Sequence, residues 1–114
     1  DEEAMKVRTE QGKIIEISKQ IPCEKGEGEF IGIAKISGNV IYPLKQVVKE
    51  LMKEKQFSSY FEGAIQRMID QKQYEITAVD TKDRFWGEVD FLEDYERVTA
   101  EISPELVTIA REQL

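Results

Sequence analysis

Trp86, Glu88 and Asp90 are the residues of this chain whose types and spacing point most directly to chemistry, because they alternate along one short segment, 85–90. In an extended backbone alternate side chains share one face, so we expect these three to point the same way. Two carboxylates on one face repel each other unless a cation or a hydrogen-bond donor lies between them. Carboxylate oxygens are also common protein ligands of Mg²⁺. The segment therefore predicts a cation site.

Two of these side chains also have a purely structural interpretation. Asp90 is followed three residues later by Glu93, and this capping-box pattern predicts that Asp90 caps a helix. Trp86 either stacks on a base or a quaternary ammonium group, or it is a half-buried aromatic of the core. The capping interpretation explains Asp90, but it accounts for neither Trp86 nor Glu88.

Lys19 and Glu62 are further candidates for binding a ligand. Lys19 comes directly after a predicted strand and is either a contact for a phosphate group or an ordinary surface lysine. Glu62 stands three residues after Ser59, so a second capping box explains it as well as a role in binding does. Cys23, the only cysteine, is interpreted as an ordinary loop thiol, because no histidine or other obvious base accompanies it.

The chain contains no histidine, which removes several kinds of catalysis. Catalytic triads, histidine-ligated zinc and imidazole acid–base chemistry are all excluded. What remains is catalysis by carboxylates, lysine, backbone dipoles or a hard cation. Mg²⁺ is the natural candidate, since it binds one or two carboxylates and completes its coordination with substrate phosphates.

Length and composition indicate a single globular domain, 1–114, with 40% hydrophobic and 34% charged residues. The net charge of −7 argues against nucleic acid as a partner, because a phosphate backbone is bound by clustered lysine and arginine. No apolar run approaches the roughly 20 residues that cross a bilayer, so we expect no membrane partner. A lone cysteine cannot form an internal disulfide, and we therefore expect a cytoplasmic protein.

Several segments read as strands. Two apolar runs on either side of Gly12 predict a hairpin with a glycine turn. A largely apolar run after Gly28 is typical of a strand that is buried on both faces. The predicted strands are 4–8, 13–17, 29–36, 74–79 and 85–90.

Four helices are also predicted. The first has Pro43 in its first turn, the second follows Ser59, the third covers roughly 91–99, and the last begins at Ser103 and Pro104, a cap with a first-position proline. The chain is therefore expected to be α/β, an α+β-like half-domain with a mixed sheet of about five strands, antiparallel hairpins and about four helices. In the first two helices apolar residues recur at helical spacing: Leu44, Val47, Val48, Leu51 and Met52, then Phe61, Ala64, Ile65, Met68 and Ile69.

Six segments, taken in order, resemble the C-terminal half of a nucleotidyltransferase of the sugar-phosphate and phosphocholine cytidylyltransferase superfamily. The most specific is WGEVD at 86–90, which is similar to the family's Trp-x-Glu-Ile-Asp signature and is followed by EDYER at 93–97. The other matching segments are EAMKV at 3–7, IEISK at 15–19, GEFIGIAKI at 28–36 and YFE at 60–62. The resemblance is greatest to the enzymes for phosphocholine or 2-aminoethylphosphonate, which sometimes occur fused to phosphoenolpyruvate mutase domains.

The resemblance implies a nucleotide-diphospho-sugar transferase-like fold and a reaction that uses Mg²⁺ as cofactor. A phosphate or phosphonate oxygen of the acceptor would attack the α-phosphate of a nucleoside triphosphate, and pyrophosphate would leave. Asp90 would be a metal ligand, and Glu88 a neighbouring ligand or an ammonium partner. The implied acceptor contacts are Lys19, which would hold the phosphate, Glu29, Glu62 and Trp86.

The 114 residues lack the Gly-rich nucleotide loop and the second metal-binding aspartate of that family. We therefore expect half of an enzyme, inactive alone, whose partners are a nucleoside triphosphate, a phosphorylated small-molecule acceptor and the missing N-terminal half. Two alternatives remain open. One is a non-catalytic module that binds a ligand on the same fold, and the other is a half-domain that self-associates as a dimer to cover its strand edges.

Overall fold

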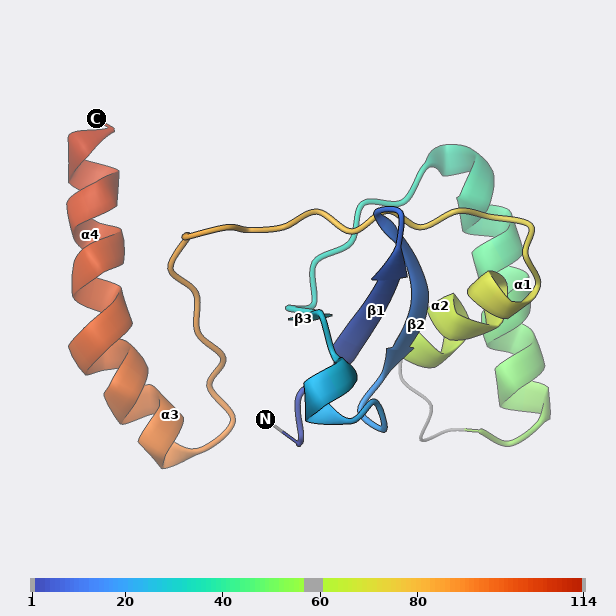
Figure 1. The fold of residues 1–114 in the computed structure, drawn as a ribbon, viewed down its shortest axis with the longest axis horizontal. Coiled ribbons are helices and arrows are strands. Elements are labelled where there is room, and N and C mark those ends of the chain that lie inside the picture. The colour runs from blue at the N-terminus through green and yellow to red at the C-terminus, as the bar shows by residue number, and fades with distance from the viewer. Residues whose placement is uncertain (1, 57–60, 114) are drawn as a thin grey trace. The chain divides into compact units, whose positions relative to one another are not determined.

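A computed structural model describes residues 2–56 and 61–113 of the chain (Figure 1). The protein contains both helices and an antiparallel sheet, so its class is mixed α/β. The chain divides into two compact units, Asp1–Val79 and Asp80–Leu114, and each is described by itself. Across the described residues, no helix is both long enough and apolar enough to cross a membrane.

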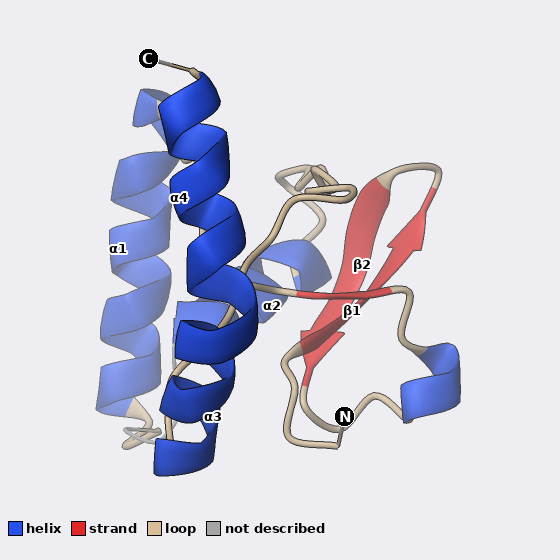
Figure 2. Ribbon diagram, turned by 90° about the vertical axis from the view of Figure 1, so that its left-hand side faces the viewer, coloured by secondary structure: helices blue, strands red, loops and turns tan. Residues whose placement is uncertain are grey.

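The first unit is built on a three-stranded antiparallel sheet in the order β2–β1–β3 (Figure 2). Its strands are β1 (Lys6–Glu10), β2 (Lys13–Ser18) and the two-residue β3 (Gly28–Glu29). Gln11 and Gly12 join β1 to β2 and have positive φ values of 53° and 78°. A type I′ hairpin turn requires positive φ at its two central positions. The predicted hairpin with its glycine turn is therefore confirmed.

The predicted strand 74–79 lies along the free edge of β2 but pairs with it only in part. Ile14 N donates to Ile76 O at 2.7 Å, and Ala78 N donates to Gly12 O at 3.1 Å. These bonds make a single isolated β-bridge and not a ladder. The segment therefore shields one edge of the sheet without becoming a fourth strand.

The predicted strands 29–36 and 85–90 are not found where the sequence indicated. In the first, extended pairing stops after β3, because Gly32 takes a φ of +84°, a left-handed conformation that turns the chain out of the sheet. In the second, the residues form no strand at all. The expected five strands are thus not confirmed, and the described parts of the chain form three.

Two α-helices complete the first unit: α1 (Gly38–Lys53) and α2 (Phe61–Asp70). The helix α2 contacts β2 on one side and α1 on the other, so it lies between the sheet and α1 (Figures 1 and 2). Pro43 lies inside α1, because that helix begins earlier than predicted. The buried residues form two clusters: Val47, Leu51, Ala64 and Met68 between the helices, and Val7, Ile17 and Ile65 between α2 and the sheet.

The second unit contains one continuous helical rod (Figure 1). It consists of α3 (Leu92–Arg97), a π-helical segment (Val98–Ile102) and α4 (Ser103–Glu112). The last helix was predicted to begin at Ser103 and Pro104, and α4 does begin at Ser103, but it continues the π-helical segment without a break and is not a separate helix. Proline lacks an N–H and its ring crowds the carbonyl four residues earlier, so the backbone widens to a π turn and continues. Apart from the short 3₁₀ helix Cys23–Lys25, the described residues therefore form three continuous helices, where about four separate helices were expected.

Candidate functional site

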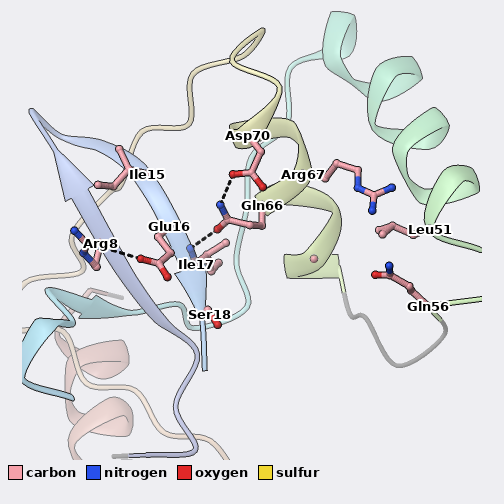
Figure 3. Close-up of a pocket in the computed structure, with 11 residues that line it drawn as sticks. Arg8, Ile15, Glu16, Ile17, Ser18, Leu51, Gln56, Gln66, Arg67 and Asp70 are labelled. Carbon is pink, nitrogen blue, oxygen red and sulfur yellow. Dashed lines mark hydrogen bonds and ion pairs between the residues drawn. The ribbon is translucent and has the colours of Figure 1, made fainter. Parts of the chain in front are cut away.

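An open hollow of about 680 Å³ lies in the first unit, where β2 faces α2 and the end of α1 (Figure 3). Its wall combines side chains of both charges with a few apolar ones. The lining residues are Arg8, Ile15, Glu16, Ile17, Ser18, Leu51, Gln56, Gly63, Gln66, Arg67 and Asp70.

Gln66 links the helix side of this hollow to the strand side. Its Oε1 accepts a hydrogen bond from Ile17 N at 2.7 Å, and its Nε2 donates to Asp70 Oδ1 at 2.9 Å (Figure 3). On the strand side, Arg8 Nη1 lies 2.8 Å from Glu16 Oε2. The polar groups of the wall are therefore held in place by one another, as a preformed binding surface requires.

Arg67 closes the end of the hollow nearest α1. Its Nη2 lies 2.7 Å from Glu54 Oε2. This hydrogen bond lowers the pKa of Glu54 and raises the pKa of Arg67. The two groups therefore stay ionised over the whole physiological pH range, and this end of the hollow holds an ion pair with no net charge.

The three predicted acceptor contacts of the first unit come from three different elements. Lys19 follows β2 in an exposed turn, and its Nζ lies 3.7 Å from Glu3 Oε2. Glu29 is exposed on β3, opposite Lys6 in the strand register. Glu62 is in the first turn of α2. None of the three lines the hollow, although Lys19 and Glu62 each adjoin a residue that does.

Glu62 is the unusual member of this set. Its Oε2 is buried, and no hydrogen-bond partner for it exists among the residues that the structure describes. The capping box predicted from Ser59 lies outside the described residues. A buried carboxylate oxygen without a partner is uncommon and calls for a donor or a cation. Among the described residues, the Glu62 oxygen is therefore the buried side-chain oxygen that still lacks a donor.

The predicted cation site lies in the second unit. Trp86 is 40% exposed, and both carboxylate residues, Glu88 and Asp90, are exposed. The segment is not a strand, so there is no longer a reason to expect that these three side chains point the same way. Within the part of the chain that is described, neither carboxylate group forms a hydrogen bond or an ion pair. No group of three or more acidic or cysteine side chains among the described residues is placed to hold a metal ion.

Asp94, and not Asp90, caps the helix α3. Its Oδ2 accepts hydrogen bonds from the backbone N–H groups of Phe91, at 3.0 Å, and of Asp90, at 3.2 Å. These bonds, that from Phe91 first, lower the pKa of Asp94. The capping interpretation of Asp90 was wrong because α3 begins at Leu92, one residue later than the pattern assumed.

Gly87 fixes the segment 85–90 against the helix of its own unit, and sequence reasoning gave it no role. A Cβ at this position would lie 2.7 Å from Val98 Cγ2 and 2.8 Å from Ile102 Cδ1. Real Cβ atoms essentially never approach so closely, so only glycine allows this contact. The sequence feature that could have indicated this contact is the position of a glycine between the two candidate residues Trp86 and Glu88.

No family model, no curated protein and no solved structure matches this chain. The resemblance to nucleotidyltransferases, read from the motifs around Trp86 and Gly28, therefore stays a prediction.

Proposed function

We propose that this chain is the acceptor-side half of a Mg²⁺-dependent nucleotidyltransferase that transfers a cytidylyl group to phosphocholine, 2-aminoethylphosphonate or a sugar phosphate. In this proposal the nucleotide is held by a Gly-rich loop outside these 114 residues, and the chain alone is inactive. The expected partners are that other half, a nucleoside triphosphate and the phosphorylated acceptor.

The observation that supports the proposal best is that the Asp90 carboxylate does not cap a helix. Because Asp94 caps α3, the structural explanation for the Asp90 carboxylate disappears. Together with Glu88 it leaves two hard, exposed oxygen ligands without partners among the described residues. Mg²⁺ prefers such a set, since it takes one or two carboxylates and keeps its remaining positions for water and phosphate oxygens.

In the proposed reaction a phosphate or phosphonate oxygen of the acceptor forms a bond to the α-phosphorus of CTP. The bond from that phosphorus to the bridging oxygen breaks, and pyrophosphate leaves with the electron pair. Mg²⁺, when bound, would neutralise the charge that develops on the phosphate oxygens. Asp90 and Glu88 are the residues that would hold it. Charge stabilisation and positioning supply most of the rate enhancement in such reactions.

The remaining predicted residues would bind the acceptor. Trp86 presents an aromatic face to a cationic head group, and such contacts are strongest when water is excluded. Lys19 would steady the phosphate, and Glu29 would contact the acceptor. The Glu62 oxygen, which has no partner among the described residues, supports a role in receiving an ammonium group, which would satisfy it.

The test is pyrophosphate release from CTP, Mg²⁺ and phosphocholine or 2-aminoethylphosphonate, with and without the segment that carries the nucleotide loop. We expect release only when both halves are present. In the complete enzyme Asp90→Asn should abolish turnover, whereas Asp83→Asn, an exposed aspartate in a turn of the same unit, should leave it unchanged. Absence of release with both halves, or full activity of Asp90→Asn, would contradict the proposal.

A second candidate function is a non-catalytic module that binds a small polar ligand, and the hollow beside Gln66 favours it. Its charged wall is prearranged and about 680 Å³ in volume, which falls in the usual range for ligand sites. This alternative predicts thermal stabilisation of the chain by a phosphorylated amine or sugar, which is lost in Arg67→Gln, with no turnover under any condition.

A further inference from the structure

The helix α1 is apolar on two of its sides. Val47 and Leu51 on one side are buried in the core against α2. On another side a second apolar surface lines a hollow of about 450 Å³, which we call the α1 groove. A helix on the surface of a globular unit normally has one apolar stripe, so a second one indicates a further contact. The lining residues of the α1 groove are Ile36, Ile41, Leu44, Lys45, Val48 and Lys49.

A row of lysines begins in the wall of the α1 groove, which Lys45 and Lys49 line, and continues along the helix to Lys53. Lys45, Lys49 and Lys53 are spaced four apart, which places them one above another on the helix. Within the described residues none of them forms an ion pair. Packing of α1 against the same helix of another molecule would bring these like charges together, which disfavours that arrangement.

The helical rod of the second unit has the opposite charge. Between Leu92 and Glu112 it carries six acidic and two basic residues, a net charge of −4. Its apolar face is covered in the middle, where Ile102 is buried, but exposed on α4, where Leu106 is 44% and Ile109 is 36% exposed. Glu105 and Glu112 are seven residues apart, so they line up beside that exposed stripe.

We propose that the α1 groove binds the helix α4 of a second copy of this chain. Leu106 and Ile109 would fill the groove, and Glu105 and Glu112 would meet the lysine row. If each copy offers both surfaces and the exchange is reciprocal, two copies form a twofold dimer. An amphipathic helix in an apolar groove is a common mode of recognition, and opposite charge along the edge selects the partner. The proposal goes beyond the function proposed above and does not depend on it.

The first test is the association state, measured by sedimentation velocity on the full chain from low micromolar to millimolar concentration. We expect a concentration-dependent dimer. Val48→Glu places a charge in the groove and should weaken association at least about tenfold, which equals about 1.4 kcal/mol. The matched control is Val79→Glu, a valine that is 88% exposed and does not line the groove, and it should associate like the wild type. A monomer at all concentrations, or equal effects of the two variants, would overturn the proposal.

The second test separates a contact between copies from one within a chain. One variant carries Lys45→Glu and Lys49→Glu, and the other carries Glu105→Lys and Glu112→Lys. Each alone should lose association, because its groove and its helix then have the same charge. A mixture of the two should recover it as a heterodimer. If mixing restores nothing, or if the four changes restore a compact monomer when combined in one chain, the second copy is not the occupant.

Discussion

Replacing Gly87 by alanine tests how the candidate cation segment is held. The added Cβ would lie 2.7 Å from Val98 Cγ2 and 2.8 Å from Ile102 Cδ1, where ordinary contact begins at about 3.4 Å. Ile102 can turn the end of its side chain away. Val98 is β-branched and restricted about χ1, so it yields only by changing rotamer or by displacing the segment. Overpacking of this kind costs about 1–3 kcal/mol.

The assay follows from the position of the single tryptophan, Trp86, next to the substitution. Its fluorescence reports whether the segment stays packed on the helix during urea unfolding. For Gly87→Ala we expect a red-shifted emission and a transition at lower urea concentration. Gly38→Ala is the control: a Cβ there meets no atom within 4 Å, and alanine is favoured over glycine in a helix.

A rescue variant makes the result decisive. Adding Val98→Ala to Gly87→Ala removes the stiffer of the two clashing groups, so the pair should lose less stability than the two single variants added together. If Gly87→Ala unfolds like the wild type with unchanged emission, or if Val98→Ala gives no relief, the close approach of Gly87 to the helix is not what holds the segment.

Four further predictions concern single residues. Leu51→Ala should lower the free energy of unfolding by about 2–5 kcal/mol in urea titrations, because Leu51 is 6% exposed in the inter-helix core. Leu92→Ala, at 68% exposure, should change it by less than about 0.5 kcal/mol. Gly12→Ala should cost about 1–2 kcal/mol through its positive φ alone, since its surroundings are open. Backbone hydrogen bonds, chiefly from Phe91, lower the pKa of Asp94. Its carboxylate therefore stabilises α3 fully at pH values above the ordinary aspartate pKa of about 3.9. This stabilisation is lost as the pH falls through the pKa of Asp94 in the folded state. Asp94→Asn should remove that acid step from the Phe91 amide shift in NMR titrations.

The elements that could be predicted from the sequence are those whose signals are local. The turn at Gly12 determines the hairpin. The helices α1 and α2 follow the spacing of their apolar residues, several of which pack together in the core. Strands fared worse, because a strand needs a neighbour and the sequence does not say which segment will pair. The run after Gly28 shows this: its apolar residues predict a long strand, yet the left-handed Gly32 ends the pairing.

The candidate site was predictable in residue type but not in contacts. Trp86, Glu88 and Asp90 stand out by chemistry, and the structure leaves both carboxylates without partners among the described residues. The roles of Asp94 and Gly87 depend on where the helix begins and on a backbone approach, and a one-residue shift at a helix start is below what pattern reasoning resolves. The π-helical segment was missed for a related reason, since Pro104 reads as a first-position proline as readily as an internal one.

Lys6 is 5% exposed, and its Nζ donates to the backbone oxygens of Glu2, at 3.1 Å, and of Ala4, at 3.0 Å. Its stem passes so close to Gly26 that a Cβ there would meet it at 3.3 Å. The first residues of the unit thus act as a backbone receptor for a buried amino group. A recombinant protein that starts after Ala4 would lack both backbone oxygens that accept from Lys6, and the start of β1 would be exposed. A recombinant version should therefore include Glu2.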